Sequence, residues 1–156
     1  MSKWKRYLPL AVSIAIAWGA AGLSFLLTGK EAMEGYAQLH QPPLSPPGWV
    51  FPVVWSVLYT LMGVSAWLVW KKPGGSREAL GSYALQLALN VLWTPVFFRL
   101  KLYWPAFGIL CALWAAILAM ILRFRRVSAK AALLQVPYLL WVTFAGYLNL
   151  GVAWLN

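Results

Sequence analysis

Five long stretches without an ionisable charge divide this sequence. All thirteen Lys and Arg residues and all three acidic residues fall outside them. An α-helix rises about 1.5 Å per residue, so roughly 20 residues cross the hydrocarbon core of a membrane. Each stretch is long enough to span a bilayer once as a helix. The stretches are residues 7–29, 41–70, 79–98, 102–122 and 131–156.

The composition excludes a water-soluble protein. Hydrophobic residues make up 62% of the 156 residues and charged residues only 10%, so polar side chains are too few to cover a surface in water. We therefore predict an all-α integral membrane protein with five transmembrane helices in one compact bundle. Residues 1–156 form a single domain, in which a long first loop, residues 29–46, joins the first two helices. The helices are expected at about 7–28, 47–70, 79–98, 103–123 and 129–154.

Basic residues are distributed unevenly between the two sides of the predicted membrane. With five spans, only Lys30, Arg99 and Lys101 fall on the side of the first loop, and all other Lys and Arg residues fall on the opposite side. Cytoplasmic loops carry an excess of such residues, which places the N-terminus inside and the C-terminus outside. This topology and anionic lipid headgroups account for the net charge of +10 without nucleic acid. The basic N-terminus and helical spans indicate a bacterial cytoplasmic membrane.

The end of the first loop is dense in proline. Pro42, Pro43, Pro46 and Pro47 cannot lie inside a regular helix, and each restricts the residue before it to extended geometry. The chain is therefore expected to run stiffly from the loop into the second helix. Proline is favourable in the first turn of a helix, so we expect this helix to start at Pro47.

Aromatic and amide side chains recur at helical spacing on three of the predicted helices, so each set shares one helix face. The three sets are Trp55, Tyr59 and Met62; Gln86, Asn90, Trp93 and Phe97; and Tyr138, Trp141, Ala145 and Asn149. Amides are unfavourable against lipid and should point into the bundle. The amides concerned are Gln86, Asn90, Gln135 and Asn149.

Two interpretations of these sets stay open. The amides could form interhelical hydrogen bonds, worth about 0.6 kcal/mol each in membranes, with the rings as filler. Alternatively, the sets could line a cavity in which aromatic walls stack a planar ligand while amides and indole N–H groups orient it.

Two further patterns concern the outside of the bundle. Small residues in the first, third and fourth helices allow close helix contact, either within the bundle or in a homodimer through the third or fourth helix. They include Gly19, Gly22, Gly81 and Gly108. Tryptophans at the ends of the stretches are expected to form an interfacial belt. These are Trp4, Trp49, Trp70, Trp104 and Trp154.

The five stretches contain no Asp, Glu, Lys, Arg or His. Proton relays and ion-coupled transporters place such groups within the membrane, so an ion-coupled pump is not expected. His40 lies in the first loop with no second ligand nearby, and we expect no metal site. No nucleophilic triad is indicated either, so any photochemistry would have to come from tryptophan and a bound ligand.

Three segments of the sequence resemble the TspO/MBR family of tryptophan-rich sensory proteins, whose mitochondrial relatives are called translocator protein or peripheral benzodiazepine receptor. The segments are PPLSPPGWVFPVVWSVLYTLMG, ALNVLWTPVFF and VPYLLWVTFAGYLN. The resemblance implies five transmembrane helices and a pocket that is closed by the first loop and lined by helices one, two, three and five. It also implies binding of porphyrins or haem and, in animal members, of cholesterol and synthetic ligands.

The resemblance carries over to particular positions. Trp55 and Trp141 match the tryptophans that the family uses around porphyrin, and Asn90 with Trp93 matches its helix-three pocket motif. Together with the helical sets, it predicts a ligand site of Tyr36, Trp55, Tyr59, Asn90, Trp93, Phe97, Tyr138, Trp141 and Ala145. The predicted lid contains Pro42, Pro43, Pro46 and Pro47.

Two positions depart from the family pattern. Gln41 and Leu44 stand where the lid commonly carries lysine and tryptophan, which weakens direct recognition of a porphyrin carboxylate. The C-terminal segment around Leu150 lacks the tyrosine and cation of the animal cholesterol motif. Cholesterol binding by that route is therefore not expected.

The sequence thus predicts a membrane protein that binds a tetrapyrrole, with the macrocycle stacked between Trp55 and Trp141. Porphyrin or haem is its ligand, and no cofactor is required. The expected role is sensing, sequestration, transport or degradation of porphyrins. Three alternatives remain: a light- and oxygen-dependent porphyrin-degrading enzyme that uses these tryptophans, a tetrapyrrole or lipophile transporter, and a structural partner protein.

Overall fold

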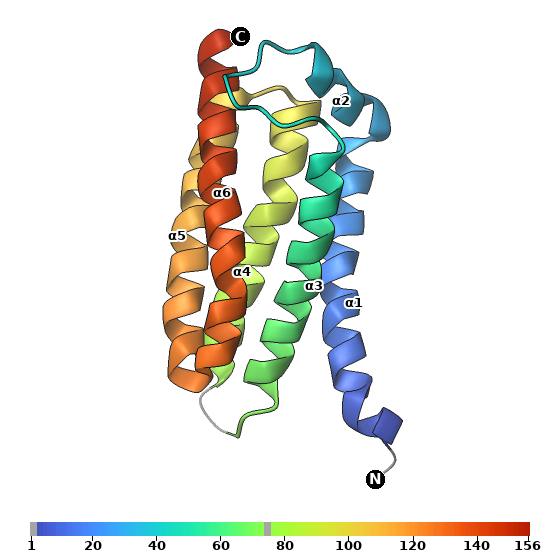
Figure 1. Cartoon of the computed structure of the whole chain (residues 1–156), viewed down its shortest axis with the longest axis vertical. Helices are drawn as coiled ribbons and strands as arrows, with labels where there is room; N and C mark the ends of the chain where they lie inside the picture. Colours follow the sequence, from blue (N-terminus) through green and yellow to red (C-terminus); the bar gives the residue numbers. More distant parts are fainter. Residues whose placement is uncertain (1–2, 74–75) are drawn as a thin grey trace.

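Five long helices run side by side along the molecule (Figure 1). The computed structural model describes residues 3–73 and 76–156. The long helices are α1 (Lys3–Thr28), α3 (Val50–Trp70), α4 (Ser76–Thr94), α5 (Tyr103–Val127) and α6 (Ala129–Leu155). The short α2 (Lys30–Glu34) and the 3-10 helix η1 (Gly35–Gln38) lie in the first loop, and the π-helix η2 (Pro95–Arg99) extends α4. The prediction of an all-helical compact bundle is confirmed.

The five predicted helices are present, although several boundaries differ. The second helix begins at Val50 and not at Pro47, so that prediction was wrong. The Val50 N–H donates to the Pro47 carbonyl at 3.0 Å in a turn before the helix. Pro52 lies in the first turn instead. N–H groups in the first turn have no intrahelical acceptor, so the N–H that proline lacks costs the helix no hydrogen bond. The predicted turn between α3 and α4 includes residues 74–75, which lie outside the described residues.

Four helices are long and apolar enough to cross a membrane by length and composition: α1, α3, α5 and α6. The fifth long helix, α4, carries Gln86 and Asn90 and does not reach that level of hydropathy. Both amides are nevertheless buried, at 0% and 2% exposure, because α4 turns them toward its neighbours. The chain is therefore a multi-pass membrane bundle in which the most polar helix faces inward.

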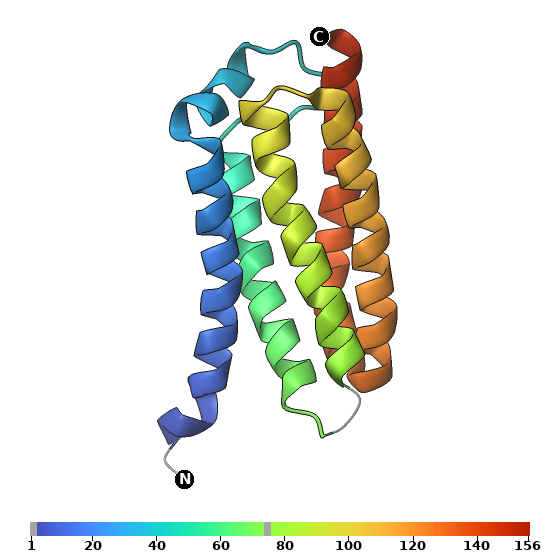
Figure 2. The ribbon, with the colours of Figure 1, turned by 180° about the vertical axis from the view of Figure 1, so that it is seen from behind.

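The long helices form a closed ring in the order α1, α3, α6, α5 and α4. Helix α1 packs against α3 and α4, whereas α6 packs against α3 and α5, and α4 also packs against α5. The first loop crosses one end of the ring, where the C-terminus also lies, and the N-terminus lies at the other end (Figure 2). We call the end with the first loop the lid end. The orientation of this end in a membrane remains a prediction.

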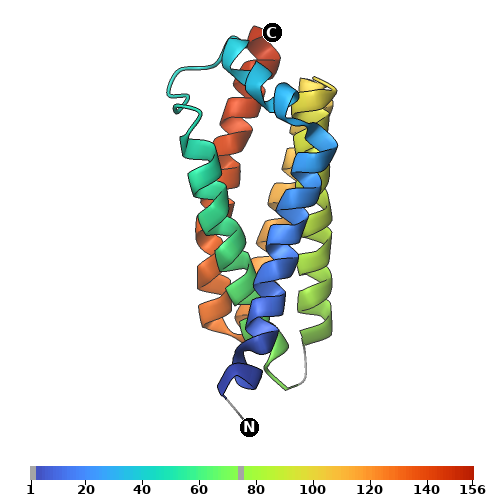
Figure 3. The same ribbon diagram turned by 90° about the vertical axis from the view of Figure 1, so that its right-hand side faces the viewer.

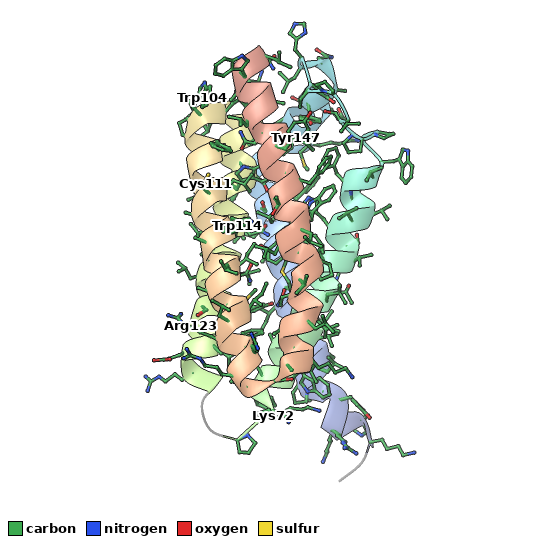
Figure 4. The ribbon with its side chains drawn as sticks, turned by 60° about the vertical axis from the view of Figure 1, so that its left-hand side comes forward. Lys72, Trp104, Cys111, Trp114, Arg123 and Tyr147 are labelled. Atoms are coloured by element: carbon green, nitrogen blue, oxygen red, sulfur yellow. The ribbon has the colours of Figure 1, made fainter. Side chains whose placement is uncertain are left out.

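The predicted belt tryptophans are all exposed, from 52% for Trp104 to 78% for Trp154. Trp104 lies at the lid end of α5, with Cys111 and Trp114 following along the same helix (Figure 4). The indole of Trp114 donates to Thr143 Oγ1 at 2.9 Å and so ties α5 to α6. Ser128, which separates these two helices, accepts from the Ala131 N–H at 3.2 Å as the N-cap of α6.

The predicted glycine contacts are not formed within the bundle. A Cβ added at Gly19, Gly22, Gly81 or Gly108 would meet no described atom within 4 Å. The close approach occurs at Gly63 of α3, where an added Cβ would lie 2.5 Å from Ile14 Cα of α1. The Ser13 hydroxyl donates to the Gly63 carbonyl at 2.7 Å in the same place. Gly63 therefore sets the spacing between α1 and α3.

Helix α6 holds the first loop across the lid end. Asn156 bonds both backbone groups of His40: its Oδ1 accepts from the His40 N–H at 3.3 Å, and its Nδ2 donates to the His40 carbonyl at 2.8 Å. The hydroxyl of Tyr147 donates to the Pro43 carbonyl at 2.6 Å. One turn after Tyr147, the ring of Pro42 lies so close to Gly151 that a Cβ there would overlap it.

Replacing Gly63 by alanine should destabilise the protein. The new methyl group meets the backbone of Ile14, so α1 must move, and overpacking of this kind costs roughly 1–3 kcal/mol. Thermal unfolding of the detergent-solubilised protein measures the change. Gly81→Ala is the matched control, because its Cβ enters open space and alanine favours helix by up to about 1 kcal/mol. Equal stability of the two variants would contradict this account of the α1–α3 contact.

Replacing Gly151 by alanine should loosen the first loop, because the added Cβ displaces the ring of Pro42. Hydrogen exchange of the backbone amides in residues 36–45 should become faster, whereas exchange in the middle of α6 should not change. Gly146→Ala on the same helix is the control, since its Cβ would make only an ordinary 3.9 Å contact with Leu110. Unchanged exchange in the loop of the Gly151 variant would show that Pro42 is not held there.

Candidate functional site

A pocket of about 530 Å³ lies between α1, α3, α4 and α6 at the lid end. Figure 3 views this end of the bundle from the side, with the loop crossing above the helices. Small-molecule sites usually have volumes of about 300–1,000 Å³, so the size suits an organic ligand. The lining residues are Trp18, Ala21, Gly22, Ser24, Phe25, Met33, Tyr36, Phe51, Pro52, Trp55, Ser56, Tyr59, Trp93, Thr94, Phe97, Phe98, Trp141, Ala145, Leu148 and Asn149.

Trp55 of α3 and Trp141 of α6 form one wall of the pocket. Their ring centroids are 6.4 Å apart and their planes are perpendicular, so the rings meet edge to face. Tyr59 lies one turn beyond Trp55, with its ring centroid 5.6 Å away. Because the two indoles contact each other, a macrocycle fits between them only if one ring rotates. The wall as it stands offers an aromatic face beside an aromatic edge.

Tyr36 extends from the first loop into a second aromatic group. Its ring centroid lies 5.7 Å from that of Phe51, 6.1 Å from Phe97 and 5.6 Å from Phe98. Burial raises the pKa of the Tyr36 phenol, so it stays neutral at physiological pH. The side chain of Gln41 donates to the Tyr36 carbonyl at 2.9 Å and steadies this part of the loop.

The π-helix η2 places two neighbouring phenylalanines in this group. Pro95 has no N–H, so the carbonyl of Val91 loses its regular helical donor, and the Ser24 hydroxyl of α1 donates to it instead at 3.3 Å. The Leu100 N–H reaches back to the Pro95 carbonyl at 3.0 Å, which is the wider π-helical spacing. As a result, Phe97 and Phe98 both lie against the Tyr36 ring.

A layer of hydrogen bonds lies behind the aromatic wall. The Tyr59 hydroxyl donates to Asn90 Oδ1 at 2.7 Å, and Asn90 Nδ2 donates to the Tyr138 oxygen at 2.7 Å. Nearer the lid, the Trp93 indole donates to Asn149 Oδ1 at 2.9 Å. These bonds join α3, α4 and α6 and fix the angle at which the aromatic rings enter the pocket.

The structure therefore contains features of both sequence interpretations. Four amides were predicted to face inward, and all are buried, with exposures of 2% or less. Asn90 and Asn149 form interhelical hydrogen bonds, as the first interpretation expects, whereas the aromatic rings of the second line a cavity.

Most of the predicted ligand residues come together in the pocket wall, namely Tyr36, Trp55, Tyr59, Trp93, Phe97, Trp141 and Ala145. Asn90 and Tyr138 lie one layer behind, where they support Tyr59. The lid prolines do not line the pocket. Pro42 and Pro43 hold the loop on α6, and Pro46 and Pro47 lead into α3.

The resemblance predicted that the first helix lines the pocket, but sequence reasoning named none of its residues. Trp18, Gly22 and Phe25 line the pocket, and their spacing of four and three residues places them on one helix face. That pattern was a usable signal, but Gly22 was interpreted as a packing residue. Trp18 and Phe25 are 44% and 47% exposed, so the pocket opens beside α1.

The pocket chemistry is almost entirely apolar. No carboxylate, amine, guanidinium or imidazole belongs to the lining residues. The Trp141 indole N–H is buried and has no hydrogen-bond acceptor among the described residues. The wall can thus stack a flat, uncharged ring system.

Comparison with known proteins agrees with this architecture. The model of the TspO/MBR family matches residues 11–155. The chain is 38% identical over 160 residues to "Tryptophan-rich protein TspO" of Chlorobaculum tepidum, covering 100% of this chain and 99% of that protein. It is 42% identical over 123 residues to "Tryptophan-rich sensory protein" of Cereibacter sphaeroides, covering 79% and 77%.

An animal relative also matches. The chain is 43% identical over 123 residues to "Translocator protein" of Ovis aries, covering 76% of this chain and 73% of that protein. The TspO/MBR proteins cross the membrane five times, which assigns α4 as the remaining span. The chain belongs to the TspO/MBR family.

Proposed function

We propose that this protein binds a porphyrin or haem in the pocket beneath the first loop and acts in the sensing, sequestration, transport or degradation of porphyrins. The observation that carries the proposal is the wall formed by Trp55 and Trp141 in a pocket of about 530 Å³. Aromatic faces stack on planar ring systems. The names of the relatives describe sensing and translocation for those proteins, and our proposal extends such roles to this chain.

The arrangement of the wall refines how the macrocycle would lie. Because Trp55 and Trp141 meet edge to face, the macrocycle stacks on one indole and meets the edge of the other, unless a ring rotates. The uncharged wall suits the apolar face of the macrocycle.

The first loop contributes the aromatic ring of Tyr36 to the pocket, but position 41 provides no positive charge that could bind a ligand carboxylate. Gln41 stands where the family commonly carries lysine, and its amide is already bonded to the Tyr36 carbonyl. We therefore propose that affinity comes from stacking and burial, and that carboxylate recognition by the loop is weak. The same pocket could admit other flat lipophilic molecules of similar size.

Titration of protoporphyrin into the detergent-solubilised protein tests the proposal. The porphyrin absorption spectrum should shift on binding. The double variant Trp55→Phe, Trp141→Phe should bind roughly fivefold more weakly, because each phenylalanine keeps an aromatic ring with a smaller face and so loses only part of an aromatic contact, about 0.5 kcal/mol each. The matched control is Trp104→Phe, Trp154→Phe. It removes an exposed indole pair whose ring centroids are also 6.4 Å apart. Equal affinity of the two double variants would show that porphyrin does not bind against Trp55 and Trp141.

Light- and oxygen-dependent breakdown of the bound porphyrin is a second candidate function. It is favoured by the presence of four indoles among the pocket lining, those of Trp18, Trp55, Trp93 and Trp141. Illumination of the porphyrin complex in air should produce a new absorbing product with the unmodified protein and with the Trp104→Phe, Trp154→Phe control. The Trp55→Phe, Trp141→Phe variant, saturated with porphyrin, should not form it. Product formation at equal rates in all three proteins would show that Trp55 and Trp141 take no part in the breakdown.

A further inference from the structure

Two glutamines in the middle of the bundle have side chains without any hydrogen-bond partner among the described residues. Gln86 of α4 and Gln135 of α6 are both 0% exposed. The Nε2 and Oε1 atoms of both are unpaired, and so is the hydroxyl of the nearby Tyr83. Unpaired polar groups are especially unfavourable inside a membrane protein, where lipid offers no alternative partner.

The two amides lie at the same level of the bundle. Helices α4 and α6 both run toward the lid end (Figure 1), and the bond from Asn90 Nδ2 to the Tyr138 oxygen joins them. Gln86 precedes Asn90 by four residues and Gln135 precedes Tyr138 by three, so each lies one turn farther from the lid on the same helix face. Tyr83 lies on that face one further turn along α4.

One turn nearer the lid end, the hydrogen bonds between side chains of the described residues leave the hydroxyl proton of Tyr138 without an acceptor. Tyr59 donates to Asn90, and Asn90 donates to the oxygen of Tyr138. The Tyr138 hydroxyl proton is donated to none of the described residues, although the ring is 1% exposed. A directed chain of hydrogen bonds therefore starts at the pocket wall and ends on an O–H group that is one turn away from the two glutamines.

We propose that Gln86, Gln135 and Tyr83 form an internal binding site for ordered water. Each glutamine offers two N–H donors and an accepting oxygen, and tyrosine offers both functions, so the occupant must donate and accept hydrogen bonds. Water does both and is small enough for a closed site with two to four polar partners. The site presents no carboxylate for a cation and no positive charge for an anion.

This water site is connected to the ligand pocket through Tyr59. The ring of Tyr59 lines the pocket, whereas its hydroxyl begins the chain that leads through Asn90 to Tyr138. The bound water accepts the remaining proton of Tyr138 and bonds to the glutamine amides. The inference does not depend on porphyrin binding, because it rests on the unpaired groups behind the pocket.

Thermal unfolding of glutamine-to-methionine variants provides the first test. Methionine has a similar length and no amide, so Gln86→Met and Gln135→Met should each lower Tm by roughly 2–4 °C if each amide holds water through net hydrogen bonds. The double variant should lose less than the sum of the two, because both amides share the same water. Gln38→Met, in the exposed part of η1, should leave Tm unchanged. A rise in Tm for both buried variants would show a dry site and overturn the proposal.

Solid-state NMR of the full, unmodified chain in proteoliposomes provides the second test and needs no variant to fold. Magnetisation should pass from water to the side-chain amides of Gln86 and Gln135, with the exposed Gln38 as the positive control. Transfer to Gln38 alone would overturn the proposal. So would a direct Gln86–Gln135 hydrogen bond without water contact, which would also lower Tm in the methionine variants.

Discussion

The bundle depends on the requirement that polar groups inside a membrane find their hydrogen-bond partners within the protein. This requirement turns the most polar long helix, α4, inward, where Asn90 joins Tyr59 of α3 to Tyr138 of α6. The same bonds hold the aromatic rings in the pocket wall at set angles. Cohesion of the helices and shape of the pocket thus arise from one set of contacts, and a change at Asn90 affects both.

The sequence predicted the spans and the inward amides well, because charge and amide groups are strongly excluded from lipid. The family resemblance, together with helical spacing, also predicted that Trp55 and Trp141 line one cavity. Spacing on single helices could not show that Asn90 and Tyr138 lie behind Tyr59, since that depends on how the helices rotate against one another. The start of α3 was misplaced because proline is favourable at several positions of a first turn, and the chain places Pro52 there.

Glycine was the residue type that sequence reasoning interpreted least well. Small residues permit close helix contact but do not require it. Gly63 is used in this way against Ile14, whereas Gly22 faces the pocket and leaves room there. The π-helical turn after Thr94 also could not be anticipated. It depends on a serine of α1 that supplies the hydrogen bond Pro95 cannot make.

Helix α6 contributes both to the pocket wall and to the attachment of the first loop. Trp141 and Ala145 belong to the pocket wall, while Tyr147, Gly151 and Asn156 hold the loop above it. A helix is stiff along its axis, so a ligand that pushes the wall outward also carries the attachment points of the loop with it. Binding of a ligand in the pocket and the position of the first loop are therefore mechanically coupled through α6.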